Sequence, residues 1–194
     1  NLFVGRGGEG NGTVIFDNAN LTSASNSASY GIHVSGREKG KDDKYDGTLI
    51  IKNSTIELDY LINKGTITLD NSTFTVKNGF SVGGRPASET ESGKDATATI
   101  DLTNGSKVVV NNHNGMGLGY EAIGVMNVED GSSFEFTEDF AVTAKGTLNV
   151  SGATLKSAAK LANLGTINVT NATVEVAKLD NDAPMFLNGT NTIK

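Results

Sequence analysis

The sequence predicts an all-β protein that folds as a parallel β-helix, a solenoid of stacked three-strand coils. Three observations support this: a short phrase recurs along the chain, a turn residue follows each copy at the same place, and the runs between turns alternate apolar and polar residues. The composition agrees, because only 37% of the 194 residues are hydrophobic while 24 are glycine and 2 are proline. A thick helical core is not expected from such a chain.

The first strand of each copy starts with a phrase that reads glycine, threonine, then alternating apolar and polar residues. Alternation with a period of two places one side chain row inward and the next outward in a strand. The clear copies occupy 12–16, 47–51, 65–69, 146–150 and 165–169, and weaker copies occupy 99–102 and 124–128. These seven phrases predict seven equivalent strands.

A turn residue stands two positions after the last apolar residue of each phrase. Asparagine and glycine enter the left-handed backbone region most easily, so a sharp corner is predicted there in every copy. Single residues fill this position in five copies, and the pairs Asn104-Gly105 and Asp130-Gly131 fill it in the other two. The single residues are Asn18, Asn53, Asn71, Gly152 and Asn171.

Two further short alternating runs follow each corner. We expect second strands at 21–23, 56–58, 74–76, 108–110, 134–136, 155–157 and 174–176, and third strands at 32–34, 60–62, 80–82, 116–118, 140–142, 161–164 and 185–187. Copies then begin about every 25 residues, with a final partial copy near residue 190. Stacking of like strands buries every inward face in one continuous core, which predicts about seven coils separated by about 4.8 Å.

The two phrases 146–155 and 165–174 carry a family resemblance. They read GTLNVSGATL and GTINVTNATV, and they resemble the repeats of right-handed parallel β-helices in bacterial surface proteins, such as autotransporter passenger domains and pectin-lyase-like adhesins. The resemblance implies a right-handed coil and an extracellular location, on a bacterial cell surface or secreted. We therefore expect residues 1–194 to form a single β-helix segment of a longer protein.

Composition limits the partners that the chain can have. The formal net charge of −6 disfavours binding to nucleic acid. The sequence contains no run of 18 apolar residues, so we expect no membrane insertion by this segment. Cysteine is absent, which removes disulfides, thiol nucleophiles and cysteine-bound zinc.

Two insertions, at 35–46 and 83–96, lengthen the corner that follows a third strand. Both open with a valine, one or two glycines and an arginine, and the segment 2–6 fits the same phrase. The arginines should therefore align on one edge of the solenoid, with the backbones of Arg37 and Arg85 about 10 Å apart. We expect a ligand-facing patch there, because arginine and tyrosine are frequent anchors of binding surfaces. Its members are Arg6, Arg37, Tyr45, Lys64 and Arg85.

Two other interpretations of these residues remain open. The arginines could instead hold the insertions together by pairing with nearby acids, namely Glu38, Asp42, Asp46, Glu89 and Glu91. In addition, Tyr30, Tyr60 and Tyr120 flank third strands, where they could form an exterior strip that stacks on sugar rings or could cover the ends of the core.

Enzyme chemistry is the main rival to binding, because the same fold carries polysaccharide lyases and hydrolases. Such enzymes need converging carboxylates or an acidic metal cluster on one outward face. Here Glu57, Glu135 and Glu175 are separated by other residues in the intervening coils, Asp101 lies on another strand, and lysines interrupt the acids at 42–46. We expect no catalytic residue, no metal site and no cofactor.

The sequence thus predicts a non-catalytic bacterial surface adhesin or host-factor-binding segment that presents corner loops to a host surface protein, an immunoglobulin or a glycan. A polysaccharide-active enzyme is the alternative. A threonine ladder that binds ice is a third possibility, although Val125 interrupts the threonine column.

Overall fold

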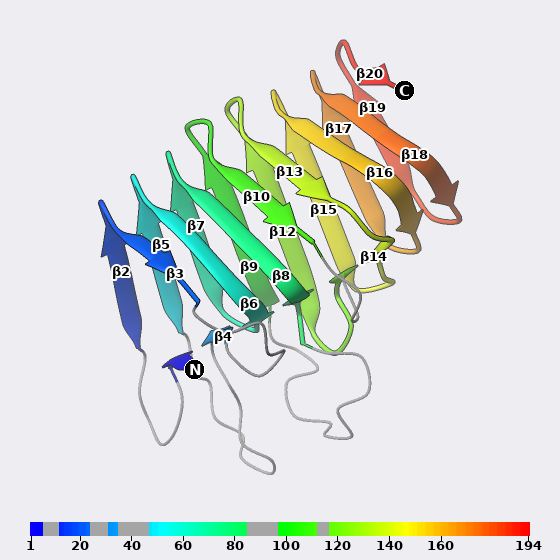
Figure 1. The fold of residues 1–194 in the computed structure, drawn as a ribbon. Coiled ribbons are helices and arrows are strands. Elements are labelled where there is room, and N and C mark those ends of the chain that lie inside the picture. Colours follow the sequence, from blue (N-terminus) through cyan, green and yellow to red (C-terminus); the bar gives the residue numbers. More distant parts are fainter. Residues whose placement is uncertain (6–11, 24–30, 35–46, 85–96, 112–116) are drawn as a thin grey trace.

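The computed structural model describes residues 1–5, 12–23, 31–34, 47–84, 97–111 and 117–194. All regular elements in these ranges are strands, β1 to β20, and nearly all pairings between them are parallel ladders between successive coils. No helix in the described ranges is long and apolar enough to cross a membrane. The expected all-β parallel β-helix is confirmed (Figure 1).

One sheet consists of the first strand of each coil. It has eight strands in the order β19-β17-β15-β12-β9-β7-β5-β2, so each coil adds one strand beside the previous one. The recurring threonine keeps the same register throughout: Thr13 pairs with Thr48, and Thr48 with Thr66. The strands are β2 (Thr13–Asp17), β5 (Thr48–Lys52), β7 (Thr66–Asp70), β9 (Thr97–Thr103), β12 (Ile123–Glu129), β15 (Gly146–Ser151), β17 (Thr166–Thr170) and β19 (Met185–Asn188).

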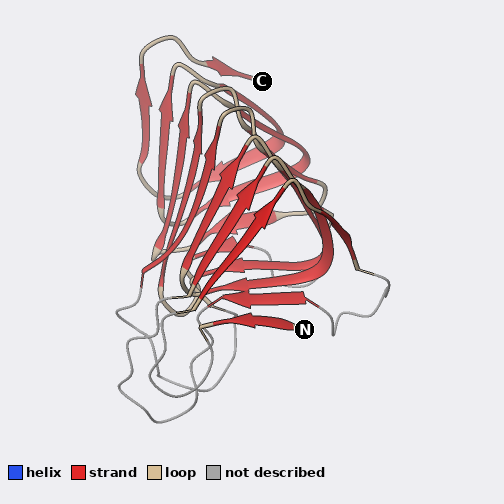
Figure 2. Cartoon of the chain, turned by 90° about the vertical axis from the view of Figure 1, so that its left-hand side faces the viewer, coloured by secondary structure: helices blue, strands red, loops and turns tan. Residues whose placement is uncertain are grey.

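The second sheet has 12 strands and contains the second and third strands of the coils, so the strands lie around three sides of the solenoid (Figure 2). The strands on the second side, some of which continue onto the third, are β3 (Asn20–Thr22), β6 (Thr55–Asn63), β8 (Thr73–Val82), β10 (Lys107–Val110), β13 (Ser133–Phe136), β16 (Thr154–Asn163), β18 (Thr173–Asn181) and β20 (Thr192–Ile193). Separate third strands are β1 (Leu2–Val4), β4 (Gly31–Val34), β11 (Gly117–Leu118) and β14 (Phe140–Val142).

Four coils differ from the expected three separate strands, because β6, β8, β16 and β18 run continuously around the second corner. The bend is made by register shifts, between Leu58 and Tyr60 in one ladder and between Ser157 and Lys160 in another. A bulge adds one residue to a strand and increases its bend, so a strand can turn this corner without ending. At the first bend the buried Asp59 accepts a hydrogen bond of 2.7 Å from the Ser23 hydroxyl.

The left-handed corners predicted after the first strands are confirmed. Asn53 has φ 47°, Asn171 has φ 48° and Gly152 has φ 57°. In the two longer corners both members of the pair lie in this region, as at Asn104 and Gly105 with φ 54° and 72°. The asparagine side chains also link successive coils, since Asn71 Nδ2 donates to Asn53 Oδ1 at 2.9 Å.

The inward rows form one continuous core along the solenoid. It contains Phe80, Phe134, Phe136 and Phe140, which are almost fully buried. Their rings contact one another, with centroids 5.0 Å apart for Phe134 and Phe140 and 6.0 Å apart for Phe80 and Phe134. Residues from the second and third sides therefore meet in the centre, and their burial stabilises successive coils together.

The last copy corrects one detail of the sequence interpretation. Residues 185–187 were expected to form a third strand, but β19 pairs with β17, with Ile167 opposite Met185, so it is the first strand of another coil. That partial coil therefore starts several residues before position 190, and β20 supplies its second strand through pairing with β18. The seventh third strand is instead the end of β18, where Asn181 pairs with Asn163. Residues 185–187 imitate a third run because every side of the coil uses the same apolar-polar alternation.

The corners offer a direct test of the backbone requirement. We expect Asn53→Ala to lower the free energy of unfolding by about 1–2 kcal/mol, because an ordinary side chain is strained in the left-handed region and the bond from Asn71 is lost. Asn53→Gly should cost less, since glycine has no such strain. Urea unfolding followed by circular dichroism measures both variants, and an alanine variant as stable as the glycine variant would contradict the argument.

Candidate binding corner

The third corner, where a third strand turns into the next first strand, is the edge to which the insertions attach. The ladders place Val4 opposite Val34, Val34 opposite Asn63, and Asn63 opposite Val82. The residues that precede the predicted arginine segments therefore lie in one column over successive coils, at about 4.8 Å per coil. Figure 1 shows β1, β4 and the ends of β6 and β8 close together at this edge.

The predicted site residues fall into two groups. Arg6, Arg37, Tyr45 and Arg85 lie outside the described residues, as do the acids proposed to pair with them in the two insertions. Lys64 is described, and it follows Asn63 in the coil between the two attachment points. The alignment of the attachment points is thus observed, whereas the patch itself stays a prediction.

A buried asparagine closes the third corner where no insertion is present. Asn63 is fully buried; its Oδ1 accepts a hydrogen bond of 2.9 Å from the Gly65 N–H, and its Nδ2 donates at 2.9 Å to the Thr99 carbonyl in β9. Asn163 repeats the arrangement with Gly165 at 3.2 Å. Because the side chain satisfies backbone groups that a tight corner leaves unpaired, Asn-x-Gly-Thr marks a corner in its shortest form.

Glycines make the same corner where the chain departs into longer segments. Gly5, Gly83 and Gly119 follow Val4, Val82 and Leu118, and all three have φ between 78° and 88°. At Gly119 a side chain would collide with the backbone of Gly146 in the next coil. The close approach of successive coils thus requires glycine at this position in addition to the backbone angle.

Lys64 forms an ion pair that crosses this corner. Its Nζ lies 2.5 Å from Glu121 Oε2, and the side chains of Lys64 and Glu121 are only 17% and 15% exposed. The pair spans two coils, because Asn63 pairs with Val82 and Val82 with Leu118. Glu121 is fixed in turn by its N–H, which donates at 2.8 Å to the Gly83 carbonyl, and its own carbonyl accepts from Lys145 Nζ at 2.8 Å.

The pair covers the backbone at the start of the 83–96 insertion. The Glu121 side chain packs against Gly84, where any side chain would collide with the carboxylate. The sequence interpretation did not single out Glu121, because it lies 57 residues from Lys64 along the chain. Alignment of Leu118 with Val82 and Asn63 would have placed Glu121 just past the same corner, which is the available signal.

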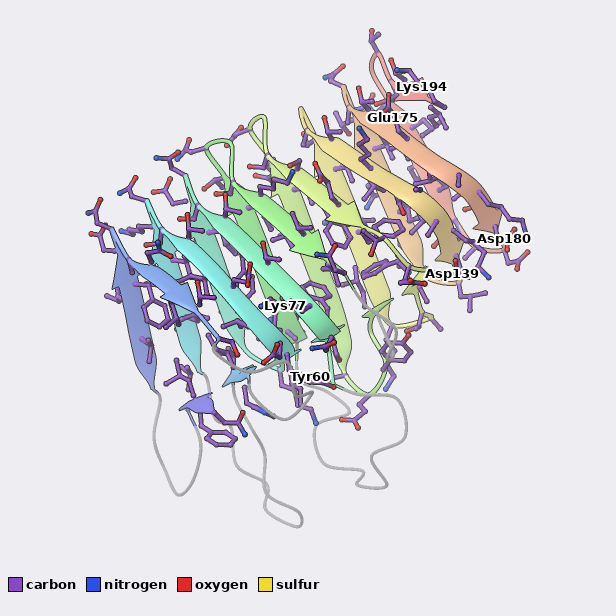
Figure 3. All side chains as sticks on the ribbon, viewed as in Figure 1. Tyr60, Lys77, Asp139, Glu175, Asp180 and Lys194 are labelled. Atoms are coloured by element: carbon purple, nitrogen blue, oxygen red, sulfur yellow. The ribbon has the colours of Figure 1, made fainter. Side chains whose placement is uncertain are left out.

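Aromatic side chains lie on the third side near this corner. The rings of Phe3 and His33 are 4.9 Å apart, and His33 and Tyr60 are 6.4 Å apart and stacked. Tyr60 is 8% exposed and its ring lies against Gly79, where a side chain would collide with it. Figure 3 shows Tyr60 at this edge of the sheet.

Tyr120 lies in the third corner that follows β11, and it packs in a similar way. Its ring lies against Gly117, where a Cβ would come within 2.9 Å of Tyr120 Cε2. Burial raises the pKa of the Tyr120 hydroxyl above its usual value. Both tyrosines thus cover small residues on the third side, which is the packing role that the sequence left open beside sugar stacking.

Three outward glutamates of the second side each pair with a lysine. Glu57 pairs with Lys77 at 2.5 Å, and Glu135 pairs with Lys107 at 2.8 Å. Glu175 pairs with Lys194 at 2.6 Å, and Figure 3 labels both of these residues. The hydrogen bond and charge of Lys194 hold the pKa of Glu175 below its usual value. In the described part of the chain, no three His, Cys, Asp or Glu side chains gather closely enough to hold a metal ion.

Comparison with known proteins adds no family to this geometry. No family model matches the chain, and no curated protein and no solved structure matches it.

The Lys64–Glu121 pair can be tested as a structural clamp. We expect Lys64→Met to lower the free energy of unfolding by about 1–3 kcal/mol, because it removes one charge of a partly buried ion pair. The double variant Lys64→Met/Glu121→Leu should recover part of that loss.

Lys178→Met is the matched control, because Lys178 also pairs with an acid, Asp180 at 2.7 Å, but is 66% exposed. It should change the stability by less than about 0.5 kcal/mol. Urea unfolding compares the three variants, and a Lys64→Met variant as stable as the control would show that the pair does not hold the corner.

Proposed function

We propose that this chain is a non-catalytic binding segment of a bacterial surface adhesin, a rigid β-helix that presents the insertions of its third corner to a host surface protein, an immunoglobulin or a glycan. The observation that carries the proposal is the single column formed by Val4, Val34, Asn63 and Val82. Three segments rich in glycine and charge leave the solenoid from this column, so their side chains can act on one ligand together.

The scaffold suits this role because it is stiff and its length grows with coil number. Each coil is joined to the next by parallel ladders on all sides, and the core runs through the whole stack. Function then resides where the repeat is interrupted, since lengthened loops on a rigid scaffold are the usual sites of recognition. The proposed location is extracellular, on the bacterial surface or secreted.

The residues proposed to contact the ligand are those of the predicted patch, Arg6, Arg37, Tyr45, Lys64 and Arg85. Arginine offers a planar set of donors and a large contact area, and tyrosine combines an apolar ring with a hydroxyl group. Lys64 lies between the attachment points, and its ammonium group pairs with the Glu121 carboxylate that lies against Gly84. We propose that it supports the patch from beneath as well as adding positive charge.

A corner without an insertion provides the design of the experiment that tests this proposal. Replacing residues 34–46 by Asn-Lys creates the sequence Asn-Lys-Gly-Thr, which copies the tight corner of Asn63 to Thr66. This variant should keep the circular dichroism spectrum and cooperative unfolding of the parent chain, while a ligand found by screening the parent against glycans and serum proteins should bind at least about tenfold more weakly.

Arg37→Ala and Arg85→Ala test the same proposal with smaller changes, and Lys156→Ala on another side is the control. Each arginine variant should weaken binding about five- to thirtyfold, as anchors of interfaces do, while the control binds like the parent. Full affinity of the shortened variant would overturn the proposal. Release of sugar products from a polysaccharide in the screen would instead identify the enzyme alternative.

A further inference from the structure

The outward face of the eight-stranded sheet, here called the flat face, differs from the other sides in the side chains that it carries. Its side chains form columns that run along the solenoid, one residue from each coil, because the strands stay in register. The first column holds Thr13, Thr48, Thr66, Thr99, Val125, Thr147 and Thr166, followed by Pro184 before β19. The middle column holds Ile15, Ile50, Thr68, Asp101, Asn127, Asn149, Asn168 and Phe186.

Charge is nearly absent from these two columns, where Asp101 is the one charged residue. The charges of the flat face lie instead in a third column at the ends of the strands, with Asp17, Lys52, Asp70 and Glu129. The middle column of the second side is different. It holds Thr22, Glu57, Thr75, Val109, Glu135, Lys156, Glu175 and Lys194. Because depletion of charge distinguishes the centre of a protein interface from other surface, the contrast points to a contact on the flat face.

The middle column is held rigid by a ladder of side-chain amides. Asn127 Nδ2 donates to Asp101 Oδ1 at 2.6 Å, Asn149 donates to Asn127 at 2.6 Å, and Asn168 donates to Asn149 at 2.7 Å. All three bonds run in the same direction along the solenoid. A surface already ordered in this way loses little conformational entropy when another surface covers it.

Large apolar side chains are exposed on the same face. Ile15 is 59% exposed, Phe186 is 58% exposed and Ile123 is 40% exposed. Ile15 and Phe186 lie in the first and last strands of one column, with the polar amide ladder between them. Exposed isoleucine and phenylalanine gain from being covered, which adds a driving force to the charge depletion.

We propose that the flat face is a self-association surface that pairs with the flat face of a second copy of this chain, with the two solenoid axes antiparallel. A second copy is the partner whose side-chain columns repeat at the same spacing, so each coil of one copy meets a coil of the other in register. A twofold axis along the strand direction generates this contact and keeps each column opposite itself.

Antiparallel pairing places no two like charges opposite each other on this face. Ile15 faces Phe186, Thr66 faces Thr147, and Asp101 faces the amide of Asn127. The charged column at the end of the strands also avoids repulsion, because its charged members face uncharged ones: Asp17 faces Asn188, Lys52 faces Thr170, Asp70 faces Ser151 and Glu129 faces Thr103. With parallel axes Asp101 would face Asp101 of the second copy, which brings like charges together.

The size of the face fits a reversible dimer. Seven spacings of about 4.8 Å between the eight strands and five residues at about 3.3 Å give a footprint of about 550 Å² on each copy. The total of about 1,100 Å² lies at the lower limit of specific interfaces, where complexes are weak and transient. We therefore expect the dimer at high micromolar to millimolar concentration, independently of any ligand at the third corner.

Two variants of the same positions test the surface and its orientation together. Thr66→Lys/Thr147→Glu puts a lysine opposite a glutamate twice across the antiparallel dimer, and should tighten dimerisation about tenfold. Thr66→Lys/Thr147→Lys puts lysines opposite each other and should weaken dimerisation about tenfold, although it reduces the net negative charge of the chain. Sedimentation velocity over a concentration series measures the dissociation constants.

The control variant Thr75→Lys/Thr173→Glu places the same charges on the second side of the coils and should dimerise like the parent chain. Small-angle X-ray scattering of the dimer should show a maximum dimension close to that of the monomer, since the copies lie side by side. A parent chain that stays monomeric at millimolar concentration overturns the proposal. The proposal is also overturned if neither flat-face variant changes the dissociation constant of the dimer, or if the variant with two lysines dimerises more tightly. A dimer whose maximum dimension is twice that of the monomer would overturn it as well.

Discussion

The shared register of the parallel ladders is the constraint on which the structure depends. Each threonine that opens a first strand lies beside the threonine of the next coil, and the same holds for the corner and core positions that follow. An inserted residue must therefore leave the ladder at a corner or be absorbed by a bulge, as at the bends beside Asp59 and after Ser157. This is why coils of very different length can stack without breaking the core.

The register also divides the surface into regions with separate roles. On the second side, outward lysines and glutamates pair with each other, as Lys107 does with Glu135. On the first side, the amide ladder from Asp101 to Asn168 occupies the middle column, which holds a single charged residue. At the third corner, Asn63 and the glycines decide whether the chain turns at once or leaves the solenoid. One repeat thus supports a core, a candidate contact face and a candidate binding edge.

The candidate site was only partly predictable from the sequence. The common phrase before Arg6, Arg37 and Arg85 correctly predicted that their attachment points lie in one column, because that column depends on strand register alone. The Lys64–Glu121 pair was missed, because the two residues are far apart in the sequence and belong to coils separated by one intervening coil. They meet only when the three coils stack at this corner. Tyr60 and Tyr120 could be placed beside third strands, but their packing against Gly79 and Gly117 depends on neighbouring coils.

By itself the sequence determined the all-β class, the number of coils, the left-handed corners and the inward rows, because each follows from local backbone preference and a period of two. The tertiary structure decided which strands run continuously around the second corner, to which side residues 185–187 belong, and which charged groups meet. Those features depend on contacts between coils, and a uniform alternation of apolar and polar residues does not encode on which side of the coil a strand lies.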